Sequence, residues 1–229
     1  MEGGPAVIDT FVTIEGFDMF FRIIQGGKPV VLFEAGGGWD SSEWDDIAPK
    51  VAARTGATVV CYDRAGFGKS DLPDIPCDMR VEAGWLWTAL EHLGLDHDVI
   101  LAGHSYGGWM IRMEADEKPD AVKGIVFIDP FSHEFVEAMG VEYLDEHPMT
   151  GKHPFDTSDP DKLTKTQKAL VRMVDKGLEG KLAIMRETRV PAGIPVFLIK
   201  SFLQTWPKES EQEAWDDALD RMAGAIEGA

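Results

Sequence analysis

The sequence predicts an α/β fold: a mostly parallel sheet flanked by helices, with an antiparallel N-terminal hairpin and a helical lid insertion. Two observations carry this prediction. From Pro29 onward, short apolar runs alternate with helical stretches. The runs are apolar throughout, which is typical of parallel strands covered on both faces. With 229 residues, 44% of them apolar, the chain suits one domain with an insertion.

The elements follow in order along the chain. Two β-rich runs joined by Glu15 and Gly16 predict the opening hairpin. Expected strands span 7–14, 17–24, 30–33, 58–62, 99–102, 124–128 and 196–199, and expected helices span 42–53, 79–93, 106–117, 163–176, 178–187 and 207–226. The alternation of strands and helices stops between Asp129 and Pro195, in a segment rich in Pro, His, Asp and Met. We therefore divide the chain into a core, 1–130 and 191–229, and a substrate-covering lid, 131–190.

Composition narrows the choice of partners and compartment. A net charge of -18 and a pI near 4.6 repel phosphate backbones and anionic membranes, so neither nucleic acid nor membrane is expected as a partner. The N-terminus has no leader-like pattern and no run is long enough to span a bilayer, which predicts a cytoplasmic protein. Cys61 and Cys77 show no metal-ligand spacing and are expected to be free thiols. We expect no metal and no organic cofactor.

A serine follows the apolar run 99–102, in the segment Gly103-His104-Ser105-Tyr106-Gly107-Gly108. Glycines on both sides allow a sharp turn between a strand and a helix, so that the hydroxyl of Ser105 stands above the carboxyl end of the sheet. A serine there is a candidate nucleophile, although it needs a base to take its proton.

A glycine-rich segment, residues 34–39, follows the predicted strand 30–33. Its backbone N–H groups can point at an anion, and a tetrahedral oxyanion needs two donors. We predict that the N–H groups of Gly37 and Tyr106 supply them, with Gly36 or Gly38 as alternatives to Gly37.

A dinucleotide site is the competing interpretation of this segment, because glycines after a strand also bind pyrophosphate. Asp63, at the end of the next strand, lies about where a ribose-binding acid would be. We disfavour the dinucleotide site because Ser41 stands where the third glycine of the dinucleotide-binding motif is expected, and because a hairpin precedes the strand.

Together with the segment Asp63-Arg64-Ala65-Gly66-Phe67-Gly68-Lys69-Ser70, these motifs make nearly the whole chain resemble the α/β-hydrolase family. The resemblance implies that the oxyanion loop follows the third strand, the segment 63–70 the fourth and the nucleophile the fifth. Arg64 is then expected to brace the wall of the site. A serine nucleophile argues against the dehalogenase and epoxide-hydrolase branches, which use an aspartate there.

The resemblance also implies a catalytic acid and a histidine. The usual acid position after the seventh strand, residues 200–204, holds no carboxylate, whereas Asp129 ends the sixth strand and is our candidate. The histidine normally follows an eighth strand, and this chain ends without either, so we expect a C-terminally incomplete version of the fold. Within the chain His133 is the one candidate substitute, although we favour a solvent-facing or substrate-contacting role for it, and another chain or fragment could supply the base. His104 is expected to point away from Ser105 and pack. The remaining histidines lie on a helix, in a turn or in the lid: His92, His97, His147 and His153.

These inferences predict a serine hydrolase of carboxylic esters that forms an acyl-serine intermediate and is impaired for lack of the usual histidine. Trp39 and Trp109 are predicted to line its substrate pocket. The alternative is a non-catalytic ligand-binding or interaction protein on the same scaffold. The uncovered edge of the seventh strand further predicts a homo-oligomer.

Overall fold

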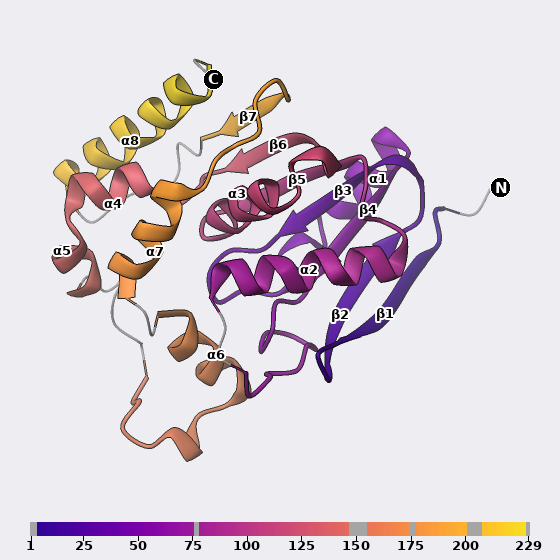
Figure 1. Ribbon diagram of the computed structural model, residues 1–229, viewed down its shortest axis with the longest axis horizontal. Coiled ribbons are helices and arrows are strands. Elements are labelled where there is room, and N and C mark those ends of the chain that lie inside the picture. Colours follow the sequence, from indigo (N-terminus) through magenta and orange to yellow (C-terminus); the bar gives the residue numbers. More distant parts are fainter. Residues whose placement is uncertain (1–3, 76–77, 147–154, 175–176, 201–207, 228–229) are drawn as a thin grey trace.

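The computed structural model describes residues 4–75, 78–146, 155–174, 177–200 and 208–227. Cys77, His147, His153 and residues 201–204, which entered the predictions above, lie outside these ranges. A seven-stranded sheet runs through the molecule in the order β1-β2-β4-β3-β5-β6-β7 (Figure 1). The strands are β1 (Val7–Ile14), β2 (Phe17–Ile24), β3 (Gly27–Glu34), β4 (Ala57–Tyr62), β5 (Val99–His104), β6 (Val122–Ile128) and β7 (Val196–Ile199). The β1–β2 and β2–β4 pairs are antiparallel and the rest are parallel, which confirms the predicted fold class.

Helices cover the sheet on both faces (Figure 1). They are α1 (Ala48–Thr55), α2 (Met79–Leu93), α3 (Gly107–Glu117), α4 (His133–Met139), α5 (Val141–Glu146), α6 (Lys165–Val174), α7 (Gly177–Glu187) and α8 (Glu209–Glu227). Apolar side chains of α2 and α3, among them Trp87 and Ile111, pack on one face. Trp44 and α1 cover β3 and β4 on the other. Within the described ranges, no helix is both long enough and apolar enough to cross a membrane.

The predicted helix 42–53 is divided in two. A 3-10 turn, Ser41–Trp44, begins where the Asp40 carboxylate accepts the N–H of Ser42 at 2.9 Å, and α1 begins only at Ala48. Pro49 explains the break, because proline has no N–H to donate to the carbonyl four residues earlier and is tolerated only in the first turn of a helix, where it stands in α1. The break points the side chain of Glu43, in the 3-10 turn, back toward the loop that follows β3.

The segment assigned to the lid contains α4 to α7. Sequence reasoning found α6 and α7 but missed α4 and α5, which are short. Side chains of α4, α5, α7 and α8 join those of α3 in one apolar cluster, where Phe135 and Trp215 are fully enclosed. In the predicted helix 163–176, residues 175–176 lie outside the described ranges. Helices α4, α5 and α7 therefore rest on α3, the helix that follows Ser105.

The edge strand β7 is the basis of one testable prediction. On the far side of β7 from β6, no strand is paired within the described residues, and Phe197 and Ile199 are 62% and 53% exposed. Unpaired edges with apolar side chains favour pairing between chains. We therefore predict that the molar mass measured by light scattering rises with concentration toward a dimer, and that Phe197→Lys keeps the protein monomeric.

Phe11, 52% exposed on the opposite edge strand β1, provides the matched control. Phe11→Lys makes the same change and should leave the association unaltered. If Phe11→Lys dissociates the dimer instead, the interface involves β1 and not β7. If the wild-type protein has the molar mass of a monomer at all concentrations, the prediction is wrong.

Candidate active site

Ser105 occupies a strained turn between β5 and α3. Its φ is 51°, in the left-handed region that residues with side chains rarely adopt, and such strain concentrates at functional sites. The turn needs glycine on both sides. A Cβ at Gly103 would lie 2.4 Å from the carbonyl oxygen of Gly107, and a Cβ at Gly107 would lie 2.6 Å from that of Glu34. The turn thus holds a half-buried serine at the carboxyl end of the parallel strands.

Hydrogen bonds tie this turn to the end of β6. The N–H of Ser105 donates to the Ile128 carbonyl at 3.2 Å, and the Ser105 carbonyl accepts the N–H of Phe131 at 3.0 Å. In the sheet His104 pairs in register with Ile128, so Ser105 and Asp129 occupy matching positions on neighbouring strands. Asp129 is 6% exposed and also has a positive φ, 46°. The predicted nucleophile and the predicted acid therefore lie next to each other.

The glycine-rich loop after β3 lies beside the same turn. A Cβ at Gly37 would come within 3.4 Å of the Tyr106 Cβ, so the two backbones run close together. The N–H of Gly36 donates to a Glu43 carboxylate oxygen at 2.7 Å and is not available to an oxyanion. This contact removes Gly36 from the three alternatives and leaves Gly37, with Gly38 as its neighbour.

The guanidinium group of Arg64 holds this loop by hydrogen bonds to its carbonyl groups. Its Nη1 donates to the Ala35 carbonyl and its Nη2 to the Gly36 carbonyl, each at 2.6 Å. The same guanidinium pairs with the carboxylate of Glu34, which is fully buried. Since both carbonyls point to Arg64, the loop turns its N–H groups the other way. This is the bracing position that the sequence predicts for Arg64.

A second buried carboxyl group, Glu114, adjoins this ion pair. The Tyr62 hydroxyl donates to Glu34 and lies 3.5 Å from Glu114. Burial and the charge of Glu34 hold the pKa of Glu114 well above its usual range. The raised pKa favours the protonated form of Glu114, whereas the carboxylate of Glu34 is the group that pairs with Arg64.

His104 differs from its prediction. Its ring is about one-third exposed instead of packed, and its Nδ1 lies 2.5 Å from Glu43 Oε1. The hydrogen bond to Glu43 raises the pKa of His104, and the charge of Asp129 contributes in the same direction. Glu43 thus holds the nucleophile turn with one oxygen and the glycine loop with the other. Sequence reasoning missed Glu43, because nothing nearby distinguishes it from an ordinary surface carboxylate on a helix.

The histidines that the structure describes do not provide an evident base for Ser105. Nδ1 of His133 lies 3.0 Å from Arg112 Nη1 and 3.1 Å from Glu134 Oε2, and burial lowers the pKa of His133. These contacts face α3 and α4, which disfavours His133 as the substitute. His92 and His97 are exposed, as expected of a helix surface and a turn.

The two tryptophans predicted to line the pocket lie in different environments. Trp39 is 60% exposed, at the end of the glycine loop. Trp109 is 2% exposed and packs against Phe131, with ring centroids 5.2 Å apart. Beside Tyr106, lid residues including Met173 enclose a cavity of about 30 Å³, the space of roughly one water molecule. Met173 of α6 thus lies beside Gly37, and Nζ of Lys181 in α7 lies 5.6 Å from the centroid of the Tyr106 ring.

Comparison with known proteins agrees with this architecture. The family model described as alpha/beta hydrolase fold matches residues 28–152, more than half of the chain. The chain belongs to the α/β-hydrolase fold family.

Among curated proteins, a proline iminopeptidase of Lactobacillus helveticus is 25% identical over 132 residues, which are 55% of this chain and 45% of the relative. One from Lactobacillus delbrueckii subsp. bulgaricus is 32% identical over 128 residues, 52% of this chain and 43% of the relative. The chain thus spans somewhat less than half the length of these relatives.

Solved structures share the fold at low identity. Epoxide hydrolase CorEH has a TM-score of 0.62 at 21% identity, covering 84% of this chain and 81% of its own. An α/β-hydrolase fold protein from Burkholderia ambifaria has a TM-score of 0.64 at 18% identity, with 93% and 88% covered. The haloalkane dehalogenase DatA from Agrobacterium tumefaciens C58 has a TM-score of 0.61 at 18% identity, with 94% and 85% covered.

Proposed function

We propose that this chain carries the nucleophile and the oxyanion-binding groups of a serine hydrolase that cleaves carboxylic esters. The observation that carries the proposal is the strained turn at Ser105, with Gly37 packed beside Tyr106. Family membership supports hydrolysis in general, and the serine favours an acyl-enzyme route over the aspartate route named above. No metal or organic cofactor enters this chemistry.

In the proposed reaction, Ser105 Oγ forms a bond to the ester carbonyl carbon while a histidine takes the hydroxyl proton. The N–H groups of Gly37 and Tyr106 stabilise the negative oxygen. The bond to the alcohol then breaks, and the alcohol leaves with the proton from the histidine. Water, deprotonated by the same histidine, attacks the acyl-serine. The bond between the acyl carbon and Oγ then breaks, the histidine returns its proton to Ser105 Oγ, and the carboxylic acid is released. We assign to Asp129 the role of orienting that histidine. Within the described residues, no histidine side chain is hydrogen-bonded to Ser105.

Labelling with a fluorophosphonate tests the nucleophile. Intact-mass analysis of the wild-type protein should show one adduct per chain, and Ser105→Ala should abolish it. Ser158→Ala, which changes an exposed lid serine, should label like wild type. If Ser105 lacks only a general base, added imidazole should accelerate labelling of the wild type and leave Ser105→Ala unlabelled.

Other outcomes would decide against the proposal. Adduct formation that survives Ser105→Ala would reject Ser105 as the nucleophile. A folded wild type that remains unlabelled with imidazole present would favour the second candidate, a non-catalytic binding protein. The contacts of His133 and the small cavity beside Tyr106 support that second candidate. Turnover of a prolyl p-nitroanilide without turnover of p-nitrophenyl butyrate would replace esters by peptides as the substrate class.

A further inference from the structure

A cavity of about 650 Å³ lies beside the C-terminal half of α3, away from Ser105. Its walls come from α3, the end of α7, the segment 188–194 that leads into β7, and α8. Ser105 precedes the N-terminal end of α3, and the helix rises roughly 15 Å over its length. The cavity is therefore separate from the candidate active site, and its volume falls in the range of small-molecule pockets.

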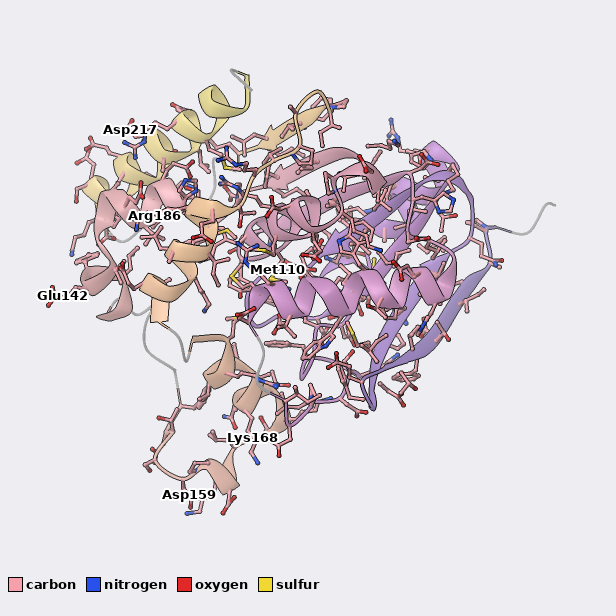
Figure 2. The ribbon with its side chains drawn as sticks, in the orientation of Figure 1. Met110, Glu142, Asp159, Lys168, Arg186 and Asp217 are labelled. Atoms are coloured by element: carbon pink, nitrogen blue, oxygen red, sulfur yellow. The ribbon has the colours of Figure 1, made fainter. Side chains whose placement is uncertain are left out.

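The lining divides into an apolar part and a polar part. The apolar part includes Ala115, Val190, Ile194, Val196 and Met222, and the polar part Arg112, Asp116, Glu134, Arg186 and Arg189. Arg186 lies between α7 and α4, where Figure 2 labels it. Such a surface suits a ligand with an apolar chain and a charged head group.

Ion pairing decides the sign of that head group. Arg186 pairs with Glu137 at 2.9 Å, and Asp116 with Arg80 at 3.6 Å. Arg189 is exposed, and its guanidinium has no ion-pair partner among the residues that the structure describes. Arg80 also pairs with the exposed Glu187 at 3.5 Å, so the local charges nearly balance, and Arg189 is the cation whose guanidinium is left to bind an anion. Glu134 does not reverse the balance, because its charge acts on Arg112.

Arg112 supplies an unused hydrogen-bond donor in the same wall. Its Nη1 lies 3.0 Å from His133 Nδ1 and its Nη2 donates to the Thr188 carbonyl at 3.2 Å. Its Nε is buried and has no hydrogen-bond partner in the described part of the chain. A buried donor without a partner is energetically costly. An acceptor on a ligand would remove that cost.

We propose that this cavity binds an amphipathic organic anion, a carboxylate with an aliphatic chain of medium length. The carboxylate lies between Arg189 and Arg112, and the chain lies along Val190, Ile194 and Met222. The proposal does not depend on Ser105 being a nucleophile.

Octanoate is the probe. We expect its titration to give saturable shifts of the methyl NMR signals of Ile194, Val196 and Met222, with a Kd on the order of 1 mM for a ligand of this size. Arg189→Glu should weaken binding by about tenfold, because it replaces attraction by repulsion at an exposed position. Arg54→Glu changes the total charge equally on the exposed surface of α1 and should bind like wild type.

Two further measurements complete the test. Octylamine, with the same chain and a cationic head, should produce no saturable shift, and Ser105→Ala should bind octanoate unchanged. Equal binding of octylamine, equal weakening by both arginine variants, or shifts confined to the Tyr106 and Met173 signals would each overturn the proposal. Circular dichroism of the variants establishes that they are folded.

Discussion

Replacing Glu34 with alanine is expected to lower the free energy of unfolding by about 3–5 kcal/mol, measured by urea denaturation followed through tryptophan fluorescence. The variant would leave the guanidinium of Arg64 buried, at 4% exposure, without its counter-charge. Glu114 is a poor replacement for Glu34, because burial raises its pKa and so disfavours its charged form. A domain of ordinary stability, about 5–15 kcal/mol, would lose a large share of its margin.

Two variants separate charge from volume. Glu34→Gln keeps the size and the hydrogen-bonding capacity and should still destabilise, because the charge of Arg64 remains unpaired. The double variant Glu34→Met with Arg64→Met removes both charges and should recover much of the stability. It should nevertheless label slowly with the fluorophosphonate, because the carbonyls of Ala35 and Gly36 lose their donor. A single Glu34→Ala that costs under about 1 kcal/mol would show that the pair does not hold the site together.

Replacing Glu43 with alanine is expected to slow fluorophosphonate labelling of Ser105 by about a hundredfold while the protein stays folded. One carboxylate holds both His104 on the nucleophile turn and the N–H of Gly36 on the glycine loop. Without it, the loop that carries Gly37 can shift relative to Ser105, and misplacement on the scale of 1 Å costs about this much in rate. The experiment rests on the proposed function, so it also needs a readout independent of labelling.

The pKa of His104 provides that readout. It is raised by Glu43, so NMR titration of Glu43→Ala should find it lowered toward the ordinary value even if labelling fails altogether. Glu43→Gln retains an acceptor for Gly36 and should give an intermediate labelling rate. Asp46→Ala, which removes an exposed carboxylate nearby in the sequence, is the matched control and should change neither quantity. Wild-type labelling in Glu43→Ala, together with a lowered pKa of His104, would show that the bridge does not position the loop.

Most of the sheet could be predicted from the sequence because burial on both faces requires unbroken apolar runs, as in β4 and β5. Helix α2 has equally local signals, with Asp78 accepting the first N–H groups and Gly94 ending it at a φ of 69°. Helices α4 and α5 were missed because their amphipathic pattern covers too few turns. Their apolar partners, such as Trp215 on α8, are distant in the sequence.

The candidate site shows the same division. Ser105, Asp129 and the glycine loop follow strand ends, so their clustering could be expected from the order of elements. Glu43 could not be recognised, because its partner His104 lies 61 positions away. The exclusion of Gly36 as an oxyanion donor depends on that same contact. Whether Trp39 and Trp109 touch a substrate, and whether Gly37 and Tyr106 bind an oxyanion, stay predictions.

The register between β5 and β6 has a consequence for engineering. Because His104 pairs with Ile128, the spacing of the Ser105 and Asp129 backbones follows from the distance between hydrogen-bonded strands, about 4.8 Å. The helices that cover the strand ends do not set this spacing. Among the described residues, helix α6 contributes no side chain to the apolar cluster that α7 shares with α3 and α8, so residues 155–174 can be regarded as an exchangeable segment. A helix grafted in its place would change which molecules gain access, while Ser105 and Asp129 keep their spacing.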